Sequence, residues 1–149
     1  MTDEEAIALA LAEAKSAAAR GEVPVGAVLL AADGALLAQD GNRIVEQRDP
    51  TAHAEMLVMR AGAAKLGNER LTGTQLFVSL EPCAMCAGAM ALARVARLVF
   101  AAEDAKGGAV VNGPRLFEQP TCHHRPIIAR GGDSIAAGDV LKEFFRARR

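Results

Sequence analysis

Two cysteines three positions apart, directly after a proline, constrain this chain more than any other feature. They form Pro82-Cys83-x-x-Cys86 at the start of an alanine-rich apolar run. A proline suits the first turn of a helix, where its missing N–H costs no hydrogen bond. We therefore expect a helix from Pro82 to about Leu92, with both thiols in its first turns and on one face. Because a helix N-terminus favours the metal-binding thiolate form, the pattern predicts a metal site there.

Length and composition indicate one globular domain spanning residues 1–149, with 51% hydrophobic and 23% charged residues. No apolar run approaches the roughly 18 residues of a membrane span, and the acidic start MTDEEAIALA is unlike a basic secretory signal. We therefore expect a cytoplasmic protein with no membrane contact. In that compartment a Cys-x-x-Cys pair indicates metal binding or catalysis more than a structural disulfide.

Apolar periodicity and turn residues predict alternating helices and strands, which is the pattern of an α/β protein with helices on both faces of one sheet. The first two strands read as a hairpin, so the sheet should be mixed. A capping box of Thr2 and Glu5 opens the first helix. The expected helices are 2–20, 51–67, 82–92 and a last one capped by Asp133 or Ser134 and ending in FFRARR; the expected strands are 23–30, 35–39, 75–79 and 97–101; 42–50 and 103–126 are expected loops.

Zinc is the natural ion for thiolates in a cytosolic protein, but two cysteines do not complete its usual four ligands. His53 is one candidate for the rest, and the segment Cys122-His123-His124 is another. A fourth ligand from that segment would make a closed structural site, which would not need Glu55. With His53 alone, one position stays open for water, and the carboxylate of Glu55 could move the protons of that water. Helical geometry separates these two side chains by about 200°, so we expect His53 at the edge of its helix and Glu55 one turn inside.

His-x-Glu followed by Pro-Cys-x-x-Cys resembles the signature of the zinc nucleobase deaminases. Further stretches, in the same order, resemble the bacterial tRNA-specific adenosine deaminases of the cytidine and deoxycytidylate deaminase superfamily: EVPVGAVLL, GNR, DPTAHAE, SLEPCAMCAGAM, LVFAAEDAKGGA and FFRARR. The resemblance implies a cytidine deaminase-like, three-layer α/β/α sandwich with a mixed central sheet. It also implies hydrolytic conversion of adenosine to inosine at the wobble position of a tRNA anticodon. Zinc would be held by His53, Cys83 and Cys86, with Glu55 as the catalytic proton carrier.

The same resemblance implies a substrate, a partner and further site residues. The substrate would be the anticodon stem-loop of a tRNA, with arginine tRNA the expected one, and the protein would be a homodimer. The residues implied in substrate binding are Asn42, the backbone N–H of Ala54, Asp104, Lys106, Phe145 and Arg146. From the residues alone, Leu141, Phe144 and Phe145 share one helix face, so the two phenylalanines could pack in the core or stack on bases.

Two other functions remain open from the sequence. One is a free nucleobase or nucleoside deaminase of the same superfamily, acting on guanine or cytosine, whose site would be closed by a lid. The segment TCHHRP (121–126) departs from the family's more usual Asn-His-Arg, which bears on the pocket rim and so on substrate identity. The other is a non-catalytic, zinc-stabilised RNA-binding module, which Glu55 and the scarcity of aromatic residues speak against. The terminal run KEFFRARR has four basic residues and one acidic residue, a pattern that suits phosphate contact or a solvated helix face.

Overall fold

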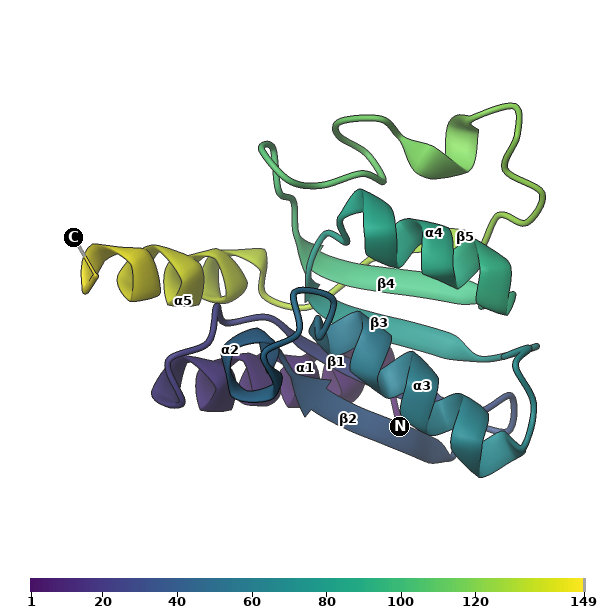
Figure 1. Ribbon diagram of the computed structural model, residues 1–149, viewed down its shortest axis with the longest axis horizontal. Coiled ribbons are helices and arrows are strands. Elements are labelled where there is room, and N and C mark those ends of the chain that lie inside the picture. Colours follow the sequence, from purple (N-terminus) through teal and green to yellow (C-terminus); the bar gives the residue numbers. More distant parts are fainter. Residues whose placement is uncertain (149) are drawn as a thin grey trace.

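The computed structural model describes residues 1–148, so Arg149 of the basic C-terminal run lies outside the described residues. Figure 1 shows the elements in space. Their order is α1 (Asp3–Ala19), β1 (Gly26–Leu30), β2 (Leu36–Gly41), α2 (Ile44–Gln47), α3 (Ala54–Leu66), β3 (Gln75–Leu80), α4 (Ala84–Ala93), β4 (Arg97–Ala102), the 3-10 helix η1 (Leu116–Glu118), β5 (Ile127–Arg130) and α5 (Ser134–Arg146). None of the described helices is long and apolar enough to cross a membrane.

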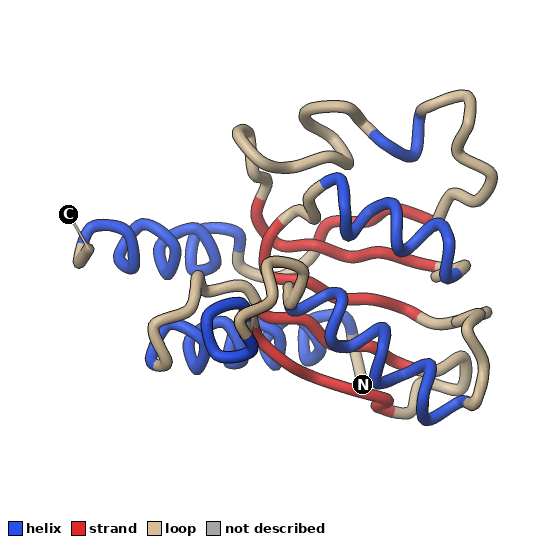
Figure 2. The backbone as a smooth tube through the Cα atoms, viewed as in Figure 1, coloured by secondary structure: helices blue, strands red, loops and turns tan. Residues whose placement is uncertain are grey.

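The strands form one mixed sheet in the order β2-β1-β3-β4-β5 (Figure 2). Strand β1 runs antiparallel to both β2 and β3, whereas β3, β4 and β5 are mutually parallel. The C-terminal ends of β2, β3 and β4 therefore meet at the same edge of the sheet as the N-terminal end of β1. That edge carries the segments that follow or precede these strands: 23–25, Asn42, 81–83 and 103–112.

Helices cover both faces of the sheet, which confirms the predicted three-layer α/β/α sandwich (Figure 1). Successive strand residues point to opposite faces, so each strand contributes to two cores. The core under α3 and α4 contains Ala27, Leu29, Leu76, Val78, Leu98 and Phe100. The core under α1 contains Val28, Leu30, Phe77 and Val99, and includes Ala137 of α5.

Helix α1 lies unusually close to the sheet because small residues face each other. A Cβ atom added at Gly26 would come within 2.6 Å of the backbone nitrogen of Ala14, and one at Gly41 within 2.6 Å of the carbonyl oxygen of Glu13. The alanines that line this helix leave room for that approach, and Ala10 and Ala14 are fully buried. The predicted capping box opens the helix, since Thr2 and Glu5 each accept a hydrogen bond from the other's backbone N–H.

The structure corrects several sequence expectations. Pro82 precedes α4 and Cys83 is its N-cap, so the proline is outside the helix rather than in its first turn. The expected loop 42–50 contains the short helix α2, because the carboxylate of Glu22 accepts the N–H groups of Val45 and Glu46 at its start. Strand β5 was not predicted; it is a short edge strand whose side chains are mostly exposed, so it lacks the alternating apolar pattern.

Candidate active site

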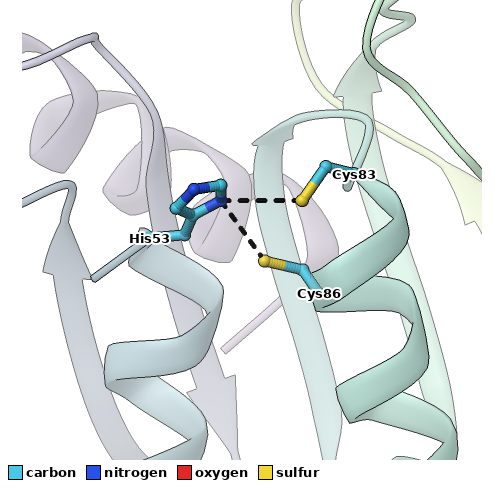
Figure 3. A group of neighbouring side chains, drawn as sticks. All are labelled: His53, Cys83 and Cys86. Atoms are coloured by element: carbon cyan, nitrogen blue, oxygen red, sulfur yellow. Dashed lines mark hydrogen bonds between the residues drawn. The ribbon is translucent and has the colours of Figure 1, made fainter. Parts of the chain in front are cut away.

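The imidazole of His53 and the thiols of Cys83 and Cys86 face one another at the start of two neighbouring helices (Figure 3). His53 is the N-cap of α3, as predicted, and Cys83 is the N-cap of α4, with Cys86 in its first turn. Nδ1 of His53 lies 3.6 Å from Sγ of Cys83 and 3.5 Å from Sγ of Cys86. The three potential ligand atoms all lie within 4.8 Å of one another.

These separations suit a tetrahedral zinc ion. With zinc–nitrogen and zinc–sulfur bonds of about 2.0 and 2.3 Å, tetrahedral geometry places the nitrogen and a sulfur about 3.5 Å apart. Both measured Nδ1–Sγ separations agree with that value. One imidazole and two thiols are also a set of ligands that binds zinc in preference to harder cations. The three side chains therefore fit a zinc ion.

The environment of the three side chains favours ionised sulfur at Cys83. A hydrogen bond from Cys86 lowers the pKa of Cys83 to about 4, and a hydrogen bond with His53 acts in the same direction. The contact with Cys83 in turn raises the pKa of His53, against the opposing effect of burial. The pKa of Cys86 is raised, because its thiol bonds to Cys83 and is buried. The two helix N-termini add positive potential at the same point. A metal cation could therefore bind here and replace the thiol protons.

Glu55 is the buried acid of the site. It lies in the first turn of α3, closer to the helix start than the predicted one turn inside, and is only 3% exposed. Burial raises the pKa of its carboxyl group to about 7. Its Oε1 is buried and has no hydrogen-bond partner among the described residues. A buried carboxylate oxygen without a partner is costly, so this atom is expected to have its partner in a bound water or substrate.

A cavity of about 240 Å³ connects these groups. Asn42 lines it and is itself buried, with its side-chain oxygen accepting a hydrogen bond from the backbone N–H of Ala54 over 2.8 Å. The N–H of Ala54 is therefore occupied by Asn42 in this structure. The residues lining the cavity are Val23, Val25, Asn42, Ile44, His53, Glu55, Leu80, Glu81, Cys83 and Asp104.

A wider groove of about 950 Å³ adjoins the cavity, between the loop after β4 and helix α5. Val23, Leu80 and Asp104 line both spaces, so they form the passage from one to the other. Four of the residues implied in substrate binding line this groove together: Asp104, Lys106, Phe145 and Arg146. Lys142 and Arg148 of the terminal run KEFFRARR also line it.

The two adjacent phenylalanines of α5 have different environments. Phe144 is 7% exposed and packs in the core, whereas Phe145 is 47% exposed and lines the groove. Their rings meet edge to face with centroids 5.3 Å apart, and the guanidinium of Arg148 lies 3.6 Å over the ring of Phe144. One phenylalanine therefore anchors the helix, and the other presents a ring to the groove.

The segment Cys122-His123-His124 does not join the metal-ligand group among the described residues. The thiol of Cys122 donates to the carbonyl oxygen of His124, and Nε2 of His124 bonds to the carbonyl oxygen of Val95 over 2.6 Å. These contacts tie the segment to the turn before β4. The alternative of a closed site with a fourth ligand from this segment therefore finds no support in the structure.

Comparison with known sequences finds similar proteins over most of the chain. Residues 1–102 match the family model described as the cytidine and deoxycytidylate deaminase zinc-binding region. A tRNA-specific adenosine deaminase of Agrobacterium fabrum is 52% identical, over 95% of this chain and 92% of that protein. The tRNA-specific adenosine deaminase of Bacillus subtilis is 44% identical, over 94% of this chain and 86% of that protein.

Solved structures with the same fold include enzymes for tRNA and for a free base. A structure from work on A-to-I editing by tRNA deaminases at the wobble position superposes with a TM-score of 0.83 and 54% identity, covering 85% of this chain and 97% of that chain. A guanine deaminase from Bacillus subtilis has a TM-score of 0.67 and 28% identity, covering 99% of this chain and 94% of that chain. Sequence identity is therefore much higher to the tRNA enzymes than to this guanine deaminase.

Proposed function

Because this chain belongs to the cytidine and deoxycytidylate deaminase family, among the tRNA-specific adenosine deaminases, we propose that it converts adenosine to inosine at the wobble position of a tRNA anticodon. The reaction consumes one water and releases ammonia from C6 of the base. The observation that carries the proposal is the buried, partnerless Oε1 of Glu55 beside His53, Cys83 and Cys86. The cavity that holds it opens into a groove lined by four cationic and two acidic side chains.

His53, Cys83 and Cys86 are the proposed zinc ligands. Bound zinc supplies Lewis acidity that lowers the pKa of a water molecule towards neutrality, which makes hydroxide available as the nucleophile.

Glu55 is the proposed catalytic acid and base. Its carboxylate takes a proton from the water and gives it to N1 of adenine, so that C6 becomes electrophilic and accepts hydroxide. Glu55 then takes the proton of the new C6 hydroxyl and gives it to the amino group, so the C6–N bond breaks, ammonia leaves and the C6 carbonyl of inosine forms. A pKa raised to about 7 by burial suits this exchange, since a group that alternately accepts and donates protons works best with a pKa near the working pH.

Asn42 and Ala54 are the proposed base-recognition residues at the cavity wall. Asn42 contributes an amide to the lining, while the backbone N–H of Ala54 is bonded to it. For Ala54 to contact the base directly, that bond must be exchanged for one to the substrate. Asn42 therefore has two proposed tasks, contacting the base and fixing the start of α3.

The wider groove is the proposed binding site for the anticodon loop. Lys106, Arg146, Lys142 and Arg148 would contact phosphates, and the exposed ring of Phe145 would stack on an unpaired base. An open groove of about 950 Å³ suits an RNA loop better than a free base enclosed by a lid. The anticodon stem-loop of an arginine tRNA is the proposed substrate within this class.

We propose that the protein acts in the cytoplasm as a homodimer. Large apolar side chains are exposed at the end of α4 and on the edge strand β5, with Leu92 81% and Ile127 68% exposed. A second copy covering them would remove this apolar surface from water. Sedimentation of the purified protein would give the mass, and a monomer at micromolar concentration would contradict the proposal.

One experiment separates this function from the alternatives. The zinc-loaded protein is incubated with an arginine tRNA anticodon stem-loop, and separately with free adenine, guanine and cytosine. Mass spectrometry then detects the replacement of an amino group by oxygen. Inosine at the wobble position is the expected product. Turnover of a free base alone would favour a nucleobase deaminase, and RNA binding without any turnover would favour a non-catalytic module.

A further inference from the structure

Glu81 is a second buried carboxylate beside the cavity, and it contacts a loop rather than the metal-ligand group. It is 2% exposed and lies directly after β3. Its Oε2 accepts backbone N–H groups from Val110, Val111 and Asn112 over 3.0, 2.9 and 3.1 Å. Its Oε1 accepts the N–H of Asp104 over 3.0 Å and the side-chain amide of Asn112 over 2.6 Å. One carboxylate therefore receives five hydrogen bonds from both ends of the loop 104–112.

The loop closes tightly around this carboxylate. A Cβ atom added at Gly108 would lie 2.6 Å from Oε2 of Glu81 and 2.5 Å from the carbonyl oxygen of Asp104. The N–H of Gly108 already donates to that carbonyl over 2.9 Å, and the N–H of Ala109 donates to the carbonyl of Pro82 over 2.9 Å. Hydrogen bonds to an ionised acceptor are stronger than neutral ones, so the carboxylate is the main anchor of the loop.

We propose that Glu81 is a positioning residue that sets the opening between the catalytic cavity and the RNA groove, an inference that rests on the proposed function. Asp104, which it holds by the backbone, lines both spaces, and Lys106 on the same loop lines the groove. Glu81 also lies two residues before Cys83, so a single strand end fixes both the loop and the start of α4. Its effect is on RNA binding, because it holds the loop that carries the groove residues.

The first test measures the loop itself in the zinc-loaded protein. In Glu81→Gln the side chain keeps its shape, but an NH₂ group replaces one of the two accepting oxygens. The N–H groups that bonded to that oxygen then have no acceptor. We expect the amides of Asp104 and Val110–Asn112 to exchange hydrogen about tenfold faster or more, with one zinc per chain retained. Glu22→Gln is the matched control, since it also removes the charge of a buried carboxylate that accepts two backbone N–H groups. It should leave exchange in 104–112 unchanged.

The second test measures catalysis on the anticodon stem-loop. We expect Glu81→Gln to raise KM about tenfold and to change kcat by less than about threefold, as for a lost binding interaction. Gly108→Ala, which keeps Glu81 and displaces the loop, should reproduce this effect. Glu118→Gln is the control, because it removes an exposed carboxylate that pairs only with Arg115 among the salt bridges of the described residues; it should leave KM and kcat unchanged.

The two tests can fail independently of the proposed function. Unchanged exchange in 104–112 for Glu81→Gln would overturn the inference, whatever the enzyme acts on. Faster exchange with an unchanged KM would overturn the claim that the loop sets RNA binding, and so would a loss confined to kcat or to zinc content. If the wild-type protein does not deaminate the stem-loop, the proposed function fails, and the exchange measurement alone decides whether Glu81 holds the loop.

Discussion

The side chain of Asn42 joins two segments of the site: its oxygen accepts the N–H of Ala54 over 2.8 Å, and its amide donates to the carbonyl of Val23 over 3.0 Å. Ala54 begins α3, the helix that carries Glu55, and Val23 lines both the cavity and the groove. The orientation of Glu55, the proposed catalytic acid, therefore depends on the amide of Asn42, directly after β2.

Replacing this amide should damage both stability and turnover. In Asn42→Ala the N–H of Ala54 loses its partner, whereas the carbonyl of Val23 keeps the N–H of Val25. Leaving one buried donor unpaired costs about 1–3 kcal/mol. Urea unfolding measures the first effect, and kcat on the stem-loop should fall as well, since Glu55 loses its support. The control is Asn68→Ala, which removes an asparagine bonded to Arg70 N–H in an exposed turn. Equal stability of the two variants would contradict the assigned role of Asn42.

Glu55→Gln should abolish turnover without loss of zinc. The amide cannot accept and return a proton, so kcat should fall by about 10²-fold or more. Metal analysis should still find one zinc per chain, because Glu55 is not among the proposed ligands, and the circular dichroism spectrum should be unchanged. Near-normal turnover in this variant would exclude Glu55 as the proton carrier.

Cys83 and Cys122 should differ in their effect on metal content. Cys83→Ser is expected to lose most of its bound zinc, because serine does not supply the thiolate that the site provides at Cys83. Cys122→Ser is the matched control, since its thiol bonds to a carbonyl oxygen and lies outside the metal-ligand group. Metal analysis after dialysis measures both. Loss of zinc from Cys122→Ser would mean that the segment 122–124 belongs to the site after all.

The phenylalanine pair of α5 should separate stability from RNA binding. Phe144→Ala removes a core ring and should lower the free energy of unfolding by about 3 kcal/mol. Phe145→Ala should change stability little and weaken binding of the stem-loop by about 1–3 kcal/mol, the contribution of one stacked base. Thermal unfolding and fluorescence anisotropy with labelled RNA measure the two effects. A large loss of stability in Phe145→Ala, with a loss of RNA binding in Phe144→Ala, would mean that Phe145 rather than Phe144 packs in the core.

The pair of Asp3 and Arg97 gives a pH-dependent contribution to stability. Their hydrogen bond of 2.6 Å lowers the pKa of Asp3 in the folded protein. The stabilisation is therefore present above the unfolded pKa and is lost as the pH falls through the folded one. Because Asp3 is nearly half exposed, we expect only about 0.5 kcal/mol between wild type and Asp3→Asn near neutral pH, vanishing as the pH falls below the folded pKa of Asp3.

Unfolding measured across this range would show the difference between the two proteins. Glu4→Gln is the control for the general effect of a charge in the first turn of α1, since no salt bridge of Glu4 is found among the described residues. A larger loss for Glu4→Gln than for Asp3→Asn would contradict the pairing.

The zinc site could be predicted from local sequence because its constraints are local. Three short-range features indicate the site: the proline before Cys83, the spacing from Cys83 to Cys86, and the carboxylate two residues after His53. The strands β1, β3 and β4 could be found for a similar reason, since their buried residues form short continuous apolar runs.

Features that depend on distant contacts could not be predicted in this way. Helix α2 forms where Glu22, more than 20 residues away, caps its N–H groups, and β5 is defined by pairing with β4 rather than by its own pattern. Glu81 lies in the stretch SLEPCAMCAGAM, but nothing in the sequence shows that five hydrogen bonds from 104–112 converge on it. The only local signal was a carboxylate placed between a buried strand and a proline.

His53 and the cysteine pair stand 30 or more positions apart on two separate helices, with β3 between them along the chain. An ion bonded to both would act as a cross-link, shortening the loop that the unfolded chain must close. Removal of the metal should therefore lower the stability of the fold as well as abolish activity. Without the ion, the contact between α3 and α4 would be the least stable part of the fold. A protease would first cleave the chain there.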